Sequence, residues 1–111
     1  MEARAQLMHA RITPRKVKIV CDLIRGRDTK TAVAILQNTP NAAAELLLKL
    51  VNSAVANAEN NHSMDPDNLY ISETFANPGP TLKRGMARAR GGYARILKRT
   101  SHITVVVKEK E

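Results

Sequence analysis

The clearest hydrophobic pattern lies in the middle of the chain. Between residues 41 and 60, apolar side chains recur every three or four positions, which is the spacing of an amphipathic helix. Glu45 and Lys49 stand four residues apart, in the order that stabilises a helix. We expect this helix to be the spine of the core. Its apolar stripe consists of Ala43, Leu46, Leu47, Leu50, Val51, Ala54 and Ala58.

Two shorter helical patterns come before it. Thr13-Pro14 is typical of an N-cap followed by a first-turn proline, and Gly26 is a typical stop. A second short helix is predicted from Asp28 or Thr29 to about Gln37. The first helix has its apolar stripe at Val17, Val20, Cys21 and Ile24, widened by Leu23, and the second at Val33, Ile35 and Leu36.

Three segments have the pattern of strands. Residues 3–12 alternate loosely, residues 69–76 hold aromatic and branched side chains, and residues 102–107 (HITVVV) are mostly β-branched. Strands at both ends of a helical block favour an α+β fold. We expect one domain over residues 1–111, with three helices packed on a small, mostly antiparallel three-stranded sheet and a long basic β-hairpin extension.

Composition excludes several functions. Aromatic residues are only 3% of the 111 residues, which argues against single-strand binding by stacking. The single cysteine, Cys21, excludes an internal disulfide and a cysteine zinc cluster, and we expect a buried, inert thiol. Asp65 and Asp67 flank a proline and are read as turn residues. The candidate histidines, His9, His62 and His102, are too scattered to suggest a metal site.

We therefore expect no enzyme activity, no catalytic residues, no metal and no cofactor. The first residues have no apolar signal core, and no stretch approaches the ~20 apolar residues of a membrane span. We expect a cytoplasmic protein.

The positive charge is unevenly distributed. The net charge is +8, yet residues 31–73 are acidic overall, while residues 74–108 hold eight basic side chains and no acidic one. A polarised field of this kind points to a polyanionic partner. Seven of these cations lie within residues 81–99: Lys83, Arg84, Arg88, Arg90, Arg95, Lys98 and Arg99.

Residues 81–99 predict an extended basic hairpin inserted between the last two strands. Gly91-Gly92 suits a turn, and arms of this length would reach ~30 Å. Such a ribbon has almost no apolar surface to bury, and an isolated two-stranded ribbon is marginal in water. We expect an anionic partner to complete it, and arginine's planar fork suits phosphate. A solvated face or a disordered basic tail is the weaker reading, because the segment is internal, lies between two strand-like runs and contains turn residues.

Several blocks of the chain resemble a known family. They are Ala10-Arg11, Arg15-Lys16-Val17, residues 22–26 (DLIRG), residues 53–61 (SAVANAENN), residues 86–91 (MARARG) and residues 95–107 (RILKRTSHITVVV). In these blocks the chain closely resembles bacterial-type protein twenty-two of the large ribosomal subunit. The resemblance covers essentially the whole sequence.

The resemblance implies a structural constituent of the large ribosomal subunit. Such a protein binds large-subunit (23S-type) rRNA, supports early assembly, and lines the nascent-peptide exit tunnel with its hairpin. Its partners would be that rRNA, neighbouring large-subunit proteins and the nascent peptide, with no membrane span and no small-molecule substrate. Carried onto this chain, the rRNA contacts are the seven cations above together with Arg11, Arg15, Lys16, Lys18 and Arg25. The tunnel-lining tip would be Met86, Ala87, Arg88, Ala89, Arg90, Gly91 and Gly92.

The tip departs from the usual pattern of the family. The family commonly has a branched residue at Gly85, a proline at Ala87, a basic residue at Gly92, a small one at Tyr93 and an acid at Ala94. Two alternatives outside the ribosome remain. An architectural DNA-binding protein would place the ribbon in a groove, and a peptide or membrane-surface binder would use the basic arm but lacks the usual amphipathic helix.

Overall fold

The structure is a computed structural model. It describes the backbone of residues 2–80, 82–87 and 93–110, and the side chains of residues 2–80 and 99–110. Over these residues it is an α+β fold, as expected, with three α-helices and two antiparallel sheets. In chain order the elements are β1 (Glu2–Ala10), α1 (Pro14–Ile24), α2 (Thr29–Gln37), α3 (Ala42–His62), a 3-10 turn η1 (Pro66–Asn68), β2 (Leu69–Pro78), β3 (Leu82–Ala87), β4 (Tyr93–Lys98) and β5 (Ser101–Glu109).

The larger sheet has β5 at its centre, in the order β1-β5-β2, and both pairings are antiparallel. The valine run of β5 suits this position because a central strand has neighbours along both of its edges. Val105 and Val107 belong to the main core, whereas Val106 is fully buried outside that cluster. The last predicted strand is therefore confirmed.

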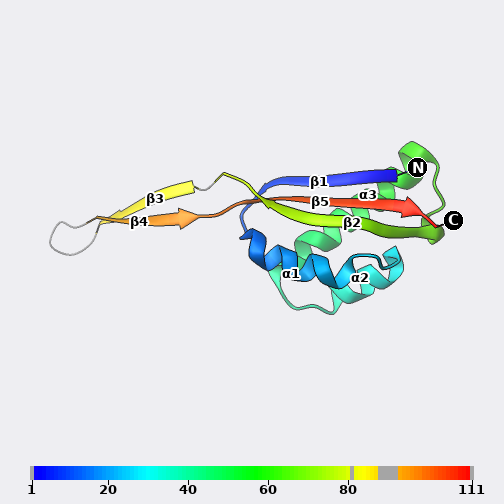
Figure 1. The fold of residues 1–111 in the computed structure, drawn as a ribbon, viewed down its shortest axis with the longest axis horizontal. Helices are drawn as coiled ribbons and strands as arrows, with labels where there is room; N and C mark the ends of the chain where they lie inside the picture. The colour runs from blue at the N-terminus through cyan, green and yellow to red at the C-terminus, as the bar shows by residue number, and fades with distance from the viewer. Residues whose placement is uncertain (1, 81, 88–92, 111) are drawn as a thin grey trace.

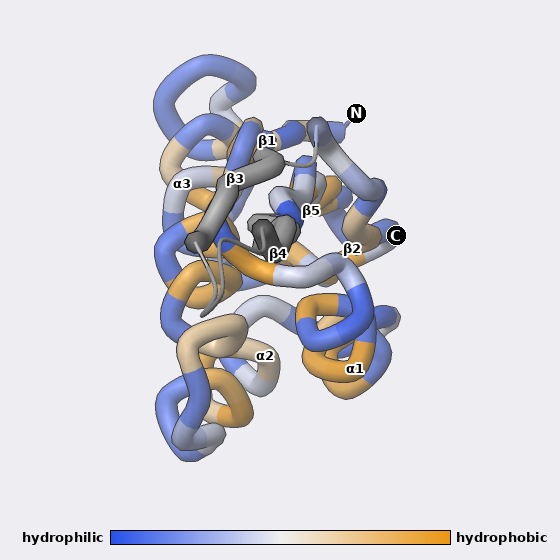
Figure 2. The backbone as a smooth tube through the Cα atoms, turned by 90° about the vertical axis from the view of Figure 1, so that its left-hand side faces the viewer, coloured by the Kyte–Doolittle hydropathy of each residue, from blue (hydrophilic) through white to orange (hydrophobic). Residues whose placement is uncertain are grey.

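The three helices lie on one side of this sheet (Figures 1 and 2). The predicted spine is confirmed: α3 packs on β1 and β5 and also contacts the other two helices. Leu47, Val51 and Ala54 on α3 have no exposed surface, while Leu46 is only half-buried. The core cluster of the described residues contains no aromatic side chain, in keeping with the low aromatic content.

The first helix differs from its prediction at two residues. Leu23 does not extend the apolar stripe, because 47% of it is exposed. Thr13 occupies the N-cap position, but its side chain makes no capping hydrogen bond. Pro14 begins the helix as expected, and Gly26, at φ +80°, follows its end. Only glycine adopts that backbone conformation without strain.

The first strand also differs from simple alternation. Ala3 and Ala5 are buried at alternate positions, but His9 is exposed and Ala10 is buried. The register against β5 shifts between Leu7 and Ala10, and His9 has φ +59°. One irregular residue moves every later side chain to the other face of a strand, so the bulge explains the switch.

Candidate nucleic-acid interface

The basic segment forms a second, two-stranded sheet. β3 pairs antiparallel with β4, from Leu82 opposite Lys98 to Ala87 opposite Tyr93. Figure 1 shows this ribbon leaving the domain along the direction of β2 and β5, and the molecule measures 65 × 26 × 16 Å. The predicted hairpin is thus present in the described strands. The predicted Gly91-Gly92 turn and tip residues Arg88, Ala89 and Arg90 lie outside the described residues.

The ribbon is joined to the domain by hydrogen bonds that continue the β2–β5 ladder. The Gly79 N–H donates to the carbonyl of Thr100 at 3.0 Å. The Thr100 hydroxyl donates to the carbonyl of Pro80 at 2.6 Å. We call this joint, together with the two histidines below, the root of the extension.

His9 and His102 meet at the root. Their rings lie edge to face with centroids 4.7 Å apart, and the His9 backbone N–H donates to His102 Nδ1 at 3.1 Å. Gly79 lies against the same ring, since a Cβ at that position would be 3.0 Å from it. Two histidines that lie 93 positions apart in the sequence are therefore neighbours in the fold. No sequence signal reveals this contact, because it depends on the bulge at His9.

A third contact brings the N-terminal segment to the root. The buried Ser101 hydroxyl donates to the Ile12 carbonyl at 2.6 Å. Ile12 belongs to the link between β1 and α1, which carries Arg11, while Arg99 lies two residues before Ser101. The N-terminal basic segment and the basic ribbon are far apart in the sequence, but this contact brings both of them to the root.

The N-terminal cations predicted to bind rRNA occupy two kinds of position. Arg11, Arg15, Lys16 and Lys18 are exposed on the link and on α1. Arg25 lies at the other end of that helix. It pairs with Asp22 at 2.6 Å and donates to the Thr74 carbonyl at 2.7 Å, so it ties α1 to β2.

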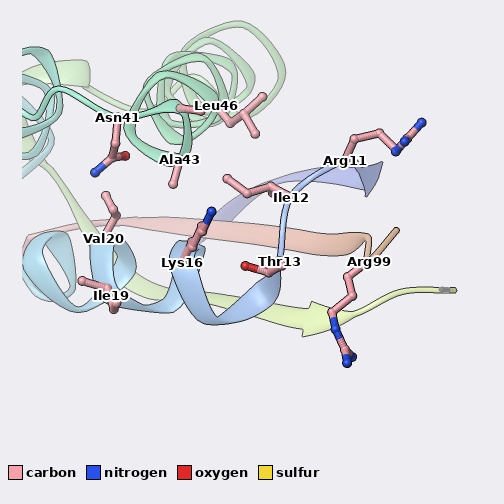
Figure 3. Close-up of a pocket in the computed structure, with 11 residues that line it drawn as sticks. Arg11, Ile12, Thr13, Lys16, Ile19, Val20, Asn41, Ala43, Leu46 and Arg99 are labelled. Atoms are coloured by element: carbon pink, nitrogen blue, oxygen red, sulfur yellow. The ribbon is translucent and has the colours of Figure 1, made fainter. Parts of the chain in front are cut away.

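A groove of about 760 Å³ lies where α1, α3 and the root meet (Figure 3). Its walls are mainly aliphatic, and Asn41 at its edge caps α3 by accepting a hydrogen bond from the Ala44 N–H at 2.8 Å. Its lining residues are Arg11, Ile12, Thr13, Lys16, Ile19, Val20, Asn41, Ala42, Ala43, Leu46 and Arg99.

The charge at the groove is entirely positive. Its described lining includes Arg11, Lys16 and Arg99 and no acidic residue. Figure 3 shows Lys16 rising from α1 into the space below Ala43, whereas Arg11 and Arg99 extend outward from the open end. A concave surface lined by one sign of charge concentrates the field, so the groove attracts anions.

The described part of the chain also bears on metal binding, thiol reactivity and membrane insertion. No three His, Cys, Asp or Glu side chains gather there in a way that could hold a metal ion. Cys21 is buried on α1, as predicted, and burial raises the pKa of its thiol. The Thr74 hydroxyl donates a hydrogen bond to its sulfur. Among the helices that the structure describes, none is long and apolar enough to cross a membrane.

Comparison with known proteins identifies the family. Residues 5–108 match the family described as "Ribosomal protein L22p/L17e". The chain belongs to this family. The resemblance seen in the sequence is thus confirmed over nearly the whole chain.

Three relatives bear the name "Large ribosomal subunit protein uL22". The one from Acetivibrio thermocellus is 58% identical over 109 residues, covering 98% of this chain and 87% of the relative. The one from Clostridium novyi is 56% identical over 110 residues, with 99% of each chain covered. The one from Clostridioides difficile is 55% identical over 111 residues and the whole of both chains. The similarity therefore includes the basic hairpin and the groove.

Proposed function

We propose that this chain is a structural, non-enzymatic protein of the large ribosomal subunit that binds large-subunit rRNA through the groove and the extension. The observation that carries the proposal is the meeting of Arg11, Lys16 and Arg99 at one groove, although they come from opposite ends of the sequence. Phosphate contacts from cations supply most of the affinity of such complexes. Membership of a family whose relatives are named for the large subunit supports RNA as the anion, and the cytoplasm as the compartment.

The extension carries the finer part of the proposal. Its seven cations and absent acids suit a ribbon surrounded by folded RNA. We assign rRNA contacts to Arg15, Lys18 and Arg25 and to the hairpin cations, and a tunnel-lining role to residues 86–92. Early assembly, neighbouring large-subunit proteins and the nascent peptide as a partner belong to the same proposal. The small residues at 85, 87, 89, 91 and 92 would allow close approach of backbone to RNA.

The test is the salt dependence of rRNA binding. Each neutralised phosphate contributes roughly 0.7–0.9 to the slope of log affinity against log salt. Lys16→Ala and Arg11→Ala should each reduce the slope by about that amount and weaken binding. Lys49→Ala is the matched control, because Lys49 is exposed on α3 outside the groove. An equal effect of all three substitutions would contradict the proposal, since it would indicate only nonspecific attraction.

A second measurement separates the ribosome from DNA. Tagged protein in growing cells should sediment with the large subunit on sucrose gradients and remain there after a high-salt wash. In binding assays, duplex DNA should compete poorly against large-subunit rRNA. Sedimentation with the nucleoid, or strong competition by duplex DNA, would favour the architectural DNA-binding alternative and overturn the proposal.

A further inference from the structure

The apolar wall of the groove is not explained by phosphate contacts. Ile19 is 63% exposed, the largest exposure among the large hydrophobic side chains that the structure describes. It lines the groove together with Ile12 and the half-buried Leu46. Phosphates need cations and N–H donors, not aliphatic side chains, so a backbone-only contact would leave this wall facing water.

The groove therefore combines two properties on one concave surface. Lys16 points into the space that the aliphatic residues line, and Arg11 and Arg99 stand at the open end. The volume, about 760 Å³, lies within the ~300–1,000 Å³ of sites that hold small organic ligands. It is larger than a single phosphate requires. The complementary ligand carries a negative charge next to an apolar surface.

We propose that the groove holds one unpaired, extruded nucleotide of the rRNA, with its base against Ile19 and Leu46 and its phosphate at Lys16. The proposal rests on the rRNA binding argued above and adds a site that reads a base. Proteins recognise RNA sequence mainly at unpaired bases, which can be turned out and packed against side chains. By packing such a base on aliphatic residues, the groove would distinguish an unpaired RNA loop from a regular RNA helix. A regular helix presents only its backbone and the edges of its bases.

Two substitutions on the same face of α1 provide a matched comparison. Ile19→Ser removes an aliphatic contact inside the groove, and Leu23→Ser removes an exposed apolar side chain one turn away that does not line it. Both side chains are exposed, Ile19 at 63% and Leu23 at 47%, so neither change should unfold the domain. Ile19→Ser should weaken binding to large-subunit rRNA by about tenfold, the effect of losing most of one aliphatic burial. The salt slope should stay unchanged, because no charge is removed. Leu23→Ser should match the wild type.

Chemical probing locates the base. With wild-type protein bound to large-subunit rRNA, dimethyl sulfate and carbodiimide should show at least one unpaired base that is protected. With Ile19→Ser at saturating concentration, that base should become reactive again while the surrounding protections persist. Leu23→Ser should protect it fully.

The outcomes distinguish failure of the nucleotide site from failure of the rRNA binding on which it rests. If wild-type protein fails to bind the rRNA, the proposed function fails. If binding is intact and Ile19→Ser gives the same protections and the same affinity as Leu23→Ser, the nucleotide site is refuted. A photo-crosslinker at position 19 in assembled subunits supplies an independent check. Crosslinking to rRNA supports the site, whereas crosslinking to a neighbouring protein assigns the groove to a peptide and overturns it.

Discussion

Gly79 is the position at which one added methyl group should disturb the root most. Its Cβ would lie 2.6 Å from Thr100 Oγ1 and 3.0–3.1 Å from the ring of His102, whereas ordinary contacts are roughly 3.5–4.0 Å. Neither the Thr100 hydroxyl nor the His102 ring can move away without weakening a hydrogen bond. The Thr100 hydroxyl is held by the Pro80 carbonyl, and the His102 ring accepts the His9 N–H. Gly79→Ala should therefore lower the free energy of unfolding by about 1–3 kcal/mol, the usual cost of overpacking.

Gly26→Ala is the matched control. A Cβ there meets nothing within 4 Å, but the residue has φ +80°. Its cost should be about 1 kcal/mol and purely conformational. Urea denaturation followed by far-ultraviolet circular dichroism gives both values, provided that the m-value stays constant.

A double-mutant cycle separates the steric cause from any other. Thr100→Ala alone should cost about 1 kcal/mol, because it leaves the Pro80 carbonyl without its donor. In that background Oγ1 is gone, so adding Gly79→Ala should cost about 1 kcal/mol less than it does in the wild type. Gly26→Ala should add independently, since distant sites do. Strict additivity of Gly79→Ala with Thr100→Ala would refute the close-packing account of the root.

Three further predictions test other parts of the fold. Asn41→Ala should cost about 1 kcal/mol in urea denaturation, because Asn41 caps the Ala44 N–H, and Asn41→Ser should restore most of the loss; equal losses would mean that the cap contributes nothing. Cys21 should resist alkylation in the native state, because burial protects the thiol and raises its pKa, and should react only as urea unfolds the chain; fast alkylation without urea would contradict its burial. Arg25→Gln should cost about 1 kcal/mol through the lost Asp22 and Thr74 contacts, and a fall in the rRNA salt slope would show that this arginine also meets phosphate.

The helices and the central strand could be predicted because local pattern decides them. The stripe on α3 has the spacing of a helix with one buried face, and the β-branched run favours a strand wherever β5 lies. Local pattern alone wrongly assigns Leu23 to the buried stripe of α1. Its spacing fits the stripe on α1, but spacing alone does not show where the neighbouring elements stop covering a helix.

The root could not be predicted in the same way. The His9–His102 pair depends on a bulge that a weakly alternating strand does not reveal. The Ser101–Ile12 contact, which lies beside the groove, likewise joins residues 89 positions apart. Sequence identified the basic residues Arg11, Lys16 and Arg99 as candidates, but only the tertiary contacts show that they share one site. The aliphatic half of the groove, including Ile19, was missed because an exposed isoleucine on an amphipathic helix has no signal of its own.

The antiparallel strands β2 and β5 both continue into the ribbon, and this determines how a force on the ribbon reaches the domain. β2 and β5 both meet the ribbon at their root ends, and β5 lies between β1 and β2. A pull on the ribbon along its axis would therefore load the β1–β5 ladder in shear, because β1 does not continue into the ribbon. In that geometry the hydrogen bonds lie perpendicular to the force, so many must break together rather than one after another. A force that separates β3 from β4 would instead open the β2–β5 ladder one pair at a time, starting at Pro78 and Ser101. The sheet is thus arranged to resist tension along the ribbon better than separation of the ribbon's two strands.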